Sequence, residues 1–422
     1  MSEAASTKKR IHSLEGNNSD SVASSAHGGV STSSPPTKKI GTTCFNSNDN
    51  EKSDSACDNN ATMTARLDNN SSSSSNDNND NINNSNDDDD DRTSKDYYFD
   101  SYSHHGIHEE MLKDEVRTKT YQLAIQNNKH LFENKIILDV GCGTGILSMF
   151  AVQAGAKHVY AVDCSSIIHH AKQIVRDNNM SEQITLIQGK MEDIDLHSLY
   201  GITKVDVIIS EWMGYFLLYE SMLNTVIVAR DKWLTPNGIV FPDKAVMYLC
   251  AVEDEAMKYE RIDFWDNVYG FDMSAIKHVA VKEPVVDIVN PQFVVTNSVP
   301  ILNIDLQHCT EEDLSFISPF RLTAHRADTI HCFVAYFECA FTQRVHQPLG
   351  FSTSPFAKYT HWKQTIFYLS DPIALCMGEE IIGTISCKPN RKNVRDLDIA
   401  LIISLDGQLT KMSNKHFDYR LR

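Results

Sequence analysis

A glycine-rich turn between a predicted strand and a predicted helix constrains the fold of this chain more than any other feature. The run Ile136–Val140 is mostly apolar and β-branched, which is typical of a strand covered on both faces of a parallel sheet. Gly141, Gly143 and Gly145 follow it, and Ile146 begins an apolar pattern with helical spacing. Such a strand, turn and helix bring backbone N–H groups close to a cofactor. A dinucleotide-binding fingerprint would place its third glycine at position 146, so this turn differs from that motif.

Composition limits the classes of protein to consider. The 422 residues suffice for two or more domains of ~100–150 residues. No run approaches the ~18 apolar residues of a membrane helix and no apolar signal segment begins the chain, so we expect a soluble protein without membrane association. Ten cysteines form no C-x-x-C pair, which favours reduced thiols in the cytosol or nucleus and indicates no metal site. A formal net charge of −17 argues against direct nucleic-acid binding and favours basic partners.

Residues 1–95 form a low-complexity segment of Ser, Asn, Asp, Thr and Gly. Large apolar side chains are almost absent, so the segment cannot bury enough surface to offset its ordering entropy, and we predict a disordered tail. The basic cluster Lys8–Arg10 could be a nuclear-import signal, although three charges in a polar tail can equally be only solvated.

Residues 96–242 alternate predicted strands and helices, which indicates a mostly parallel, doubly wound sheet. A helix is predicted over residues 106–121, and either it is an ordinary exposed helix or one stripe of it is functional. Residues three positions apart would lie along that stripe: His108, Met111, Asp114 and Arg117.

Two acidic residues are candidates for binding a cofactor at the carboxyl edge of this sheet. Asp163 ends the predicted strand 158–163, about where an acid can accept hydrogen bonds from the hydroxyl pair of a ribose. Glu192 follows the next strand, where it either accepts an adenine amino group or faces water.

Residues 243–422 have a different pattern, with short alternating runs separated by turn signals. This pattern is typical of a β-barrel or sandwich. Residues 259–287 interrupt it with many aromatic side chains, and this insertion either packs on its own domain or projects to contact another subunit.

Two carboxylates flank an apolar, aromatic segment directly after the predicted strand 205–210. Glu211 and Glu220 are nine positions apart, and a break at Gly214 would let a hairpin-like loop turn both toward one point. Facing carboxylates repel each other unless a cation lies between them, so we expect both to face inward without counter-ions until a guanidinium binds. Glycoside hydrolysis also uses paired carboxylates but needs no cofactor turn, and both side chains could simply be solvated.

From about Asp96 the chain resembles the predominant type I family of protein arginine N-methyltransferases. The glycine turn reads D-V-G-C-G-T-G at Asp139–Gly145, as in class I S-adenosylmethionine-dependent methyltransferases. Further matches are Y-F-D-S-Y at 98–102, S-E-W-M-G-Y at 210–215, Y-E-S-M-L at 219–223, V-Y-G-F-D-M at 268–273 and Y-T-H-W-K-Q-T at 359–365. The resemblance implies a class I methyltransferase Rossmann-like domain over 96–242, with N-terminal lid helices, and a β-barrel domain over 243–422. It implies that the insertion 259–287 is a helical dimerisation arm, so that the protein forms at least a homodimer.

The resemblance also implies a role for each matching residue. Glu211 and Glu220 would grip the substrate guanidinium, and His361 paired with Asp114 would lie beside it. S-adenosyl-L-methionine would be bound by the residues His108, Arg117, Gly141, Gly143, Asp163, Glu192, Tyr98 and Phe99. The space around the substrate would be shaped by Met111, Met222, Tyr102 and Trp362. The family usually has glutamate where this chain has Asp163, so the affinity for the cofactor is open at this point.

Alternatives to this function remain. A small-molecule or nucleic-acid methyltransferase would keep the glycine turn but would have an Asn/Asp-Pro-Pro-aromatic motif or a basic groove, which are absent. A non-catalytic scaffold would not need the carboxylate pair. The family suggests arginine-glycine-rich proteins and histone tails as substrates, asymmetric dimethylarginine as the product, and a location in nucleus and cytoplasm. Either Glu220 or the His361–Asp114 pair could receive the proton that methylation releases.

Overall fold

The computed structural model describes residues 102–422, so the predicted tail, Tyr98 and Phe99 lie outside the described residues. The first half contains a parallel five-stranded sheet in the order β3-β2-β1-β4-β5. Its strands are β1 (Ile136–Val140), β2 (His158–Asp163), β3 (Ile184–Gln188), β4 (Val205–Ile209) and β5 (Leu234–Phe241). The order reverses between β1 and β4, so the segments after these two strands meet at the carboxyl edge, where α/β sheets bind ligands.

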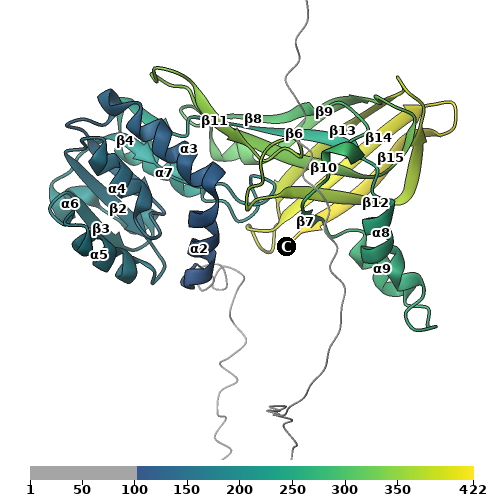
Figure 1. Cartoon of the computed structure of the whole chain (residues 1–422), viewed down its shortest axis with the longest axis horizontal. Helices are drawn as coiled ribbons and strands as arrows, with labels where there is room; N and C mark the ends of the chain where they lie inside the picture. The colour runs from purple at the N-terminus through teal and green to yellow at the C-terminus, as the bar shows by residue number, and fades with distance from the viewer. Residues whose placement is uncertain (1–101) are drawn as a thin grey trace, which may run out of the picture. The chain divides into compact units, whose positions relative to one another are not determined.

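Helices pack around this sheet, as Figure 1 shows. They are α2 (His105–Lys113), α3 (Glu115–Gln126), α4 (Ile146–Gln153), α5 (Ile168–Asp177), α6 (Leu196–Tyr200) and α7 (Leu223–Trp233). Short 3-10 helices are η1 (Lys129–Leu131) and η2 (Met191–Asp193). None of the helices within residues 102–422 is long and apolar enough to cross a membrane.

The single helix predicted over residues 106–121 is wrong, because two helices occupy this segment. Asp114 separates α2 from α3 with an extended backbone, φ −68° and ψ 92°. Its carboxylate accepts a hydrogen bond from the Arg117 backbone N–H at 3.0 Å, which caps the start of α3. The residues of the predicted stripe therefore do not share one continuous helix face.

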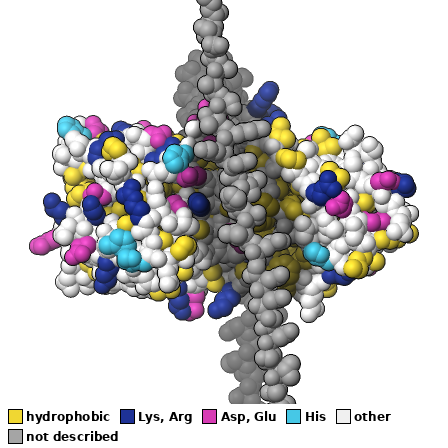
Figure 2. Space-filling model, turned by 90° about the horizontal axis from the view of Figure 1, so that it is seen from above, with side chains coloured by type: hydrophobic (Ala, Val, Ile, Leu, Met, Phe, Trp, Pro, Cys, Tyr) yellow, Lys and Arg dark blue, Asp and Glu magenta, His cyan; other side chains and the backbone are white. Residues whose placement is uncertain are grey.

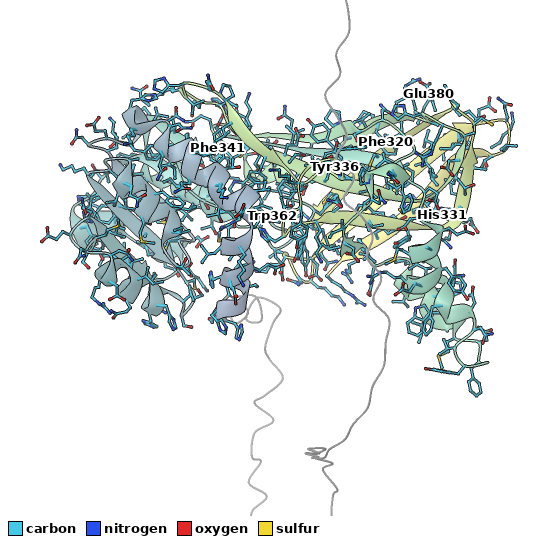
Figure 3. All side chains as sticks on the ribbon, viewed as in Figure 1. Phe320, His331, Tyr336, Phe341, Trp362 and Glu380 are labelled. Carbon is cyan, nitrogen blue, oxygen red and sulfur yellow. The ribbon has the colours of Figure 1, made fainter. Side chains whose placement is uncertain are left out.

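Two antiparallel sheets form the second half, in the orders β7-β12-β10-β6-β8, with β11 beside β10, and β15-β14-β13-β9. The strands are β6 (Lys244–Val252), β7 (Val285–Asp287), β8 (Val299–Asp305), β9 (Phe316–Thr323), β10 (Asp328–Phe341), β11 (Leu349–Ser352), β12 (Gln364–Leu375), β13 (Glu380–Pro389), β14 (Leu397–Asp406) and β15 (Lys411–Leu421). Two more 3-10 helices, η4 (Pro291–Phe293) and η5 (Glu311–Leu314), lie in its connections. Every second residue of β14 from Leu397 to Leu405 is buried, so one face of its sheet lines the core. Phe320 on β9, labelled in Figure 3, joins the two sheets, because its ring lies 6.1 Å from the ring of Phe333 on β10. The predicted parallel sheet and barrel-like domain are both confirmed.

Aromatic packing joins the two halves. Phe341, near the end of β10, lies edge-on to Tyr121 of α3 and 5.0 Å from Phe241 of β5. All three rings are fully buried, so the barrel and the cofactor sheet share a continuous core at this point. This core fixes α3, and with it the pocket described below.

The aromatic insertion forms a helical arm that projects from the barrel (Figure 1). It consists of α8 (Glu255–Arg261), η3 (Asp263–Asp266) and α9 (Ser274–Ala280). At its base Lys258, only 5 % exposed, and Lys277 both bind the Asp263 carboxylate at 2.8 Å. At its tip Tyr269 is 97 % exposed and Phe271 is 69 % exposed. Ile262 of the arm is buried in one cluster with Val252 and Ile366, so the base of the arm packs on its own domain while the rest projects. Contact of the arm with another subunit stays a prediction.

Candidate active site

One pocket at the carboxyl edge of the parallel sheet gathers most of the predicted site residues. The members that line it are Tyr102, His108, Met111, Arg117, Gly141, Gly143, Asp163, Glu192, Glu211, Glu220, Met222, His361 and Trp362. They come from α2 and α3, from the segments after β1, β2, β3 and β4, and from the segment before β12. Asp114 lies outside this lining and contacts it through His361.

Backbone conformation explains the glycine turn. Gly141, Gly143 and Gly145 have φ values of 73°, 53° and 85°, in the left-handed region that glycine adopts without strain. A Cβ on Gly141 would lie 2.4 Å from Met222 Cε, and a Cβ on Gly143 would lie 3.2 Å from the His108 ring. Glycine is therefore required at both positions, and the turn forms a cradle in the pocket lining that Met222 and His108 approach closely.

Asp163 and Glu192 face the cradle from neighbouring strands. One Asp163 oxygen accepts the Gly143 N–H at 2.8 Å, and the other accepts the Ser165 N–H at 2.8 Å and its hydroxyl at 2.7 Å. Glu192 accepts a hydrogen bond from the Thr225 hydroxyl at 2.6 Å. Ser165 and Thr225 fix the positions of the two carboxylates, and no sequence pattern singled them out.

Arg117 and Glu211 form a buried ion pair. Arg117 Nε and Nη2 each lie 3.0 Å from Glu211 Oε2, and each side chain is only 8 % exposed. The Arg117 Nη1 also donates to the Met111 carbonyl at 3.2 Å. The expectation that Glu211 lacks a counter-ion is therefore wrong. The physical reason is that a carboxylate in this buried position is stabilised by a permanently charged guanidinium beside it.

The segment after β4 is a tight hairpin that turns both glutamates into the pocket. The Gly214 N–H donates to the Leu217 carbonyl at 3.0 Å, and the Tyr219 N–H donates to the Tyr215 carbonyl at 2.9 Å. A Cβ on Gly214 would lie 1.7 Å from the Tyr219 carbonyl oxygen, so only glycine fits there. Glu220 itself has a φ of 53°.

Burial raises the pKa of the Glu220 carboxyl above its usual range. Arg395 and the Tyr219 hydroxyl act in the opposite direction, whereas Asp396 adds to the increase. Burial, followed by Glu220, raises the pKa of Tyr219 to about 12. Tyr219 and Arg395 also line the pocket; Tyr219 belongs to the Y-E-S-M-L match, whereas no sequence pattern singled out Arg395.

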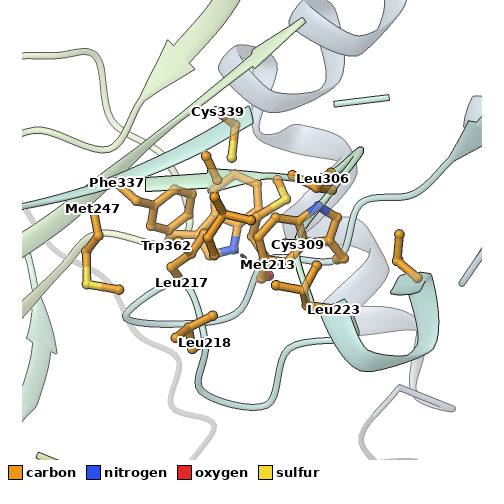
Figure 4. Packing of buried hydrophobic residues seen from close by; sticks show 14 of the residues in the cluster. Met213, Leu217, Leu218, Leu223, Met247, Leu306, Cys309, Phe337, Cys339 and Trp362 are labelled. Atoms are coloured by element: carbon orange, nitrogen blue, oxygen red, sulfur yellow. Dashed lines mark hydrogen bonds between the residues drawn. The ribbon is translucent and has the colours of Figure 1, made fainter. Parts of the chain in front are cut away.

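The Thr-His-Trp segment holds the hairpin from the barrel side. The Trp362 indole N–H donates to the Met213 carbonyl at 3.0 Å, the dashed contact of Figure 4. The indole stacks on Phe351 with ring centroids 5.3 Å apart and meets the edge of Phe337 at 5.5 Å. Trp362 therefore contacts the back of the hairpin.

Asp114 orients His361. One carboxylate oxygen of Asp114 accepts the His361 backbone N–H at 2.9 Å and lies 2.8 Å from its Nδ1. Burial alone would raise the pKa of Asp114, but hydrogen bonds from His361 and from the Arg117 backbone outweigh it and lower the pKa. A stable carboxylate on Nδ1 leaves the imidazole Nε2 as the free nitrogen.

Comparisons with known proteins agree with this geometry. Residues 243–408 match the arginine methyltransferase oligomerization subdomain, and residues 118–240 match the ribosomal protein L11 methyltransferase family. Protein arginine N-methyltransferase 1 of Schizosaccharomyces pombe is 60 % identical over 307 residues, 73 % of this chain and 89 % of the relative. The enzyme of the same name from Chlamydomonas reinhardtii is 54 % identical over 330 residues, 78 % of this chain and 94 % of the relative. This chain belongs to the protein arginine N-methyltransferase family.

Solved structures of this family have the same fold. The Trypanosoma brucei PRMT1 enzyme–prozyme heterotetrameric complex with AdoHcy has a TM-score of 0.73 and 48 % identity, covering 76 % of this chain and 100 % of that chain. Arabidopsis thaliana protein arginine methyltransferase 10 has a TM-score of 0.67 and 30 % identity, covering 77 % and 99 %. The predicted membership of the family and its enzyme class are therefore confirmed.

S-adenosyl-L-methionine is the methyl donor of a protein arginine N-methyltransferase, and the pocket fits this cofactor. Gly141 and Gly143 line the pocket without a side chain, so their backbone is accessible to the cofactor. Arg117 offers a cation for a carboxylate, and Asp163 and Glu192 offer acceptors for hydroxyl and amino groups. These donors and acceptors match the polar groups of the cofactor in kind.

Proposed function

We propose that this chain is a type I enzyme that forms mono- and asymmetric dimethylarginine on basic proteins such as histone tails and arginine-glycine-rich proteins. The observation that carries the proposal is the hairpin, which turns Glu211 and Glu220 into the same pocket as the glycine cradle. A planar guanidinium has donors on several edges and matches a carboxylate on each side. Met111 and Met222 line the same space, and their bulk would favour the asymmetric product.

In this proposal the two carboxylates activate the substrate nitrogen. A guanidinium is a poor nucleophile because its lone pairs are delocalised, and Glu211 and Glu220 would localise its positive charge away from the attacking nitrogen. S-adenosyl-L-methionine supplies an activated methyl group on a sulfonium sulfur. The remaining task of the protein is alignment, which the cradle and the hairpin provide from adjacent strands.

Arg117 would bind two carboxylates. It pairs with Glu211 in this structure, and the carboxylate of the cofactor would share it when the cradle is filled. His108, whose Nε2 lies 2.8 Å from the Tyr102 carbonyl oxygen, would position α2 beside the cradle.

Glu220 is the best candidate to receive the proton from the methylated nitrogen. It would contact the guanidinium directly, and burial raises its pKa toward the range of an effective base. His361 would assist by accepting the proton in a second step, because Asp114 orients its ring in the pocket lining.

We further propose that the arm docks on a second copy, forming a homodimer or a higher assembly, and that the protein acts in nucleus and cytoplasm. The exposed aromatic side chains of the arm support the first proposal, and the basic cluster Lys8–Arg10 supports the second. Acidic and basic side chains are interspersed over the described part of the face in Figure 2, which suits protein substrates better than nucleic acid.

The direct test is labelled methyl transfer to a Gly-Arg-Gly-rich peptide, followed by analysis of the modified arginine. We expect mono- and asymmetric dimethylarginine. Symmetric dimethylarginine as the main product would overturn the type I assignment, and no transfer to any arginine peptide would overturn the substrate class.

A further inference from the structure

A second cavity lies beside the reaction pocket, between α2, the start of α3 and the segment before β12. Its lining includes Glu110, Lys113, Lys358, Tyr359 and His361. Glu110 and His361 line both cavities, so together they form a common wall. A peptide whose arginine enters the reaction pocket would pass this wall on one side of the target.

Among residues 102–422, the other carboxylates of the second cavity already have a side-chain partner. Glu109 pairs with Lys113, Glu115 pairs with Lys119 at 2.8 Å, and Asp114 holds His361. The Glu110 backbone carbonyl accepts the Asp114 N–H at 3.0 Å, but its carboxylate has no hydrogen bond or ion pair among residues 102–422. Its negative charge is therefore available to a ligand at the boundary of the two cavities.

Two tyrosine rings adjoin this carboxylate. Tyr359, in the wall of the second cavity, is 54 % exposed, and Tyr215 of the hairpin is 38 % exposed. Glu110 lines the reaction pocket together with Tyr215 and the second cavity together with Tyr359. Consistent with this placement, its charge adds to burial in raising the pKa of each phenol. A carboxylate beside exposed aromatic faces is a favourable site for a cation.

Resting on the function proposed above, we propose that Glu110 and Tyr359 form a subsite for a basic side chain that flanks the target arginine in the substrate. The subsite would select among arginine-containing sequences, and it would not take part in methyl transfer. Its contribution would be that of one partly exposed ion pair and one cation–π contact, about three- to tenfold in KM.

The test uses the full-length chain and peptides with a single target arginine in a glycine-rich sequence. One set carries a lysine at each position from two to five residues before or after the target, and the matched set carries glutamine there. Lysine is chosen because it supplies the charge without adding a second methylation site. KM and kcat are measured for each pair at low and at high salt.

We expect the unmodified enzyme to have a lower KM for lysine peptides on one side of the target, with kcat within about twofold, and a smaller preference at high salt. Glu110→Gln should remove the preference. Glu109→Gln is the matched control. The Glu109 carboxylate is adjacent in sequence but already pairs with Lys113, so this variant should keep the preference. Tyr359→Leu should weaken the preference, and Tyr359→Phe should retain it.

The proposal would be overturned by an unmodified enzyme without a lysine preference, by a Glu110→Gln variant that keeps it, or by equal effects of Glu110→Gln and Glu109→Gln. A Glu110→Gln variant with reduced kcat on all peptides would also overturn it, by assigning Glu110 to methyl transfer instead. Failure of the proposed function is distinct, because the unmodified enzyme would then methylate neither peptide set.

Discussion

The glycine turn after β1 and the hairpin after β4 build the same pocket by different means. The turn reaches the left-handed region with glycine at positions 141, 143 and 145, so its shape is encoded locally. The hairpin places Phe216, Leu217 and Glu220 in the same region, with φ between 49° and 61°. Non-glycine residues persist there only when surrounding contacts hold them, at a cost on the order of 1 kcal/mol or more each.

The barrel supplies the contacts that hold the hairpin. Trp362 binds the Met213 carbonyl, and Phe216 lies edge-on to Phe367 of β12 with ring centroids 5.4 Å apart. The carboxylates that would grip the substrate thus depend on a second domain, whereas the cofactor cradle depends on its own sequence. Perturbing each region separately should therefore separate substrate chemistry from cofactor binding.

Glu211→Gln should give the largest difference between the effect on methyl transfer and the effect on cofactor binding. We expect methyl transfer to fall by roughly a thousandfold, because the transition state loses one of its two flanking charges. Affinity for S-adenosylhomocysteine, measured by calorimetry, should change little, since the cradle is intact and the amide oxygen can still accept from Arg117. Unchanged turnover would eliminate the two-carboxylate mechanism, and lost cofactor binding would show that the Arg117–Glu211 pair shapes the cradle itself.

Gly214→Ala tests the hairpin backbone without removing a functional group. Its Cβ would meet the Tyr219 carbonyl oxygen at 1.7 Å, so the hairpin must open and Glu220 must move. We expect activity to fall by about a hundredfold while cofactor affinity is retained. Gly378→Ala is the control, because its Cβ would meet nothing within 4 Å although φ is 83°. Equal activity losses in the two variants would indicate general destabilisation instead.

Asp139, beneath the glycine turn, gives a pH-dependent comparison. Its side chain is fully buried, one oxygen accepts the Ser148 hydroxyl at 2.6 Å, and the other has no hydrogen-bond partner among residues 102–422. Burial raises the pKa of Asp139 to about 7. Because the folded pKa exceeds the unfolded value, the folded protein loses stability as the pH rises through about 7.

Asp139→Asn should remove this loss. Between pH 5 and pH 8 the free energy of unfolding of the variant should rise relative to the unmodified protein by roughly 2 kcal/mol, measured by urea unfolding. Ser148→Ala is the comparison: it keeps the carboxyl but removes a hydrogen bond that lowers the Asp139 pKa, so the loss of stability should extend to higher pH. A pH-independent difference for Asp139→Asn would mean that Asp139 does not titrate in this range.

The contrast between the locally encoded glycine turn and the hairpin held by distant contacts also explains which features could be predicted from the sequence. The strand, the glycine turn and the alternating pattern of β14 were predictable, because local periodicity and backbone freedom determine them. The break at Asp114 was not, since it depends on a capping hydrogen bond and on His361 from a distant segment. The Arg117–Glu211 pair joins residues 94 positions apart, and no local pattern encodes it.

Trp362→Phe should have the smallest effect and probes the contact between barrel and hairpin. Phenylalanine keeps the ring stack on Phe351 but leaves the Met213 carbonyl without the indole N–H. We expect a loss of about 1–2 kcal/mol in the free energy of unfolding. KM for the peptide should rise a few-fold as the hairpin loosens, with cofactor affinity unchanged. Phe351→Leu is the matched control, because it disturbs the ring stack and keeps the hydrogen bond from the indole N–H. An equally large increase in KM in this control would show that packing, rather than this hydrogen bond, positions the hairpin.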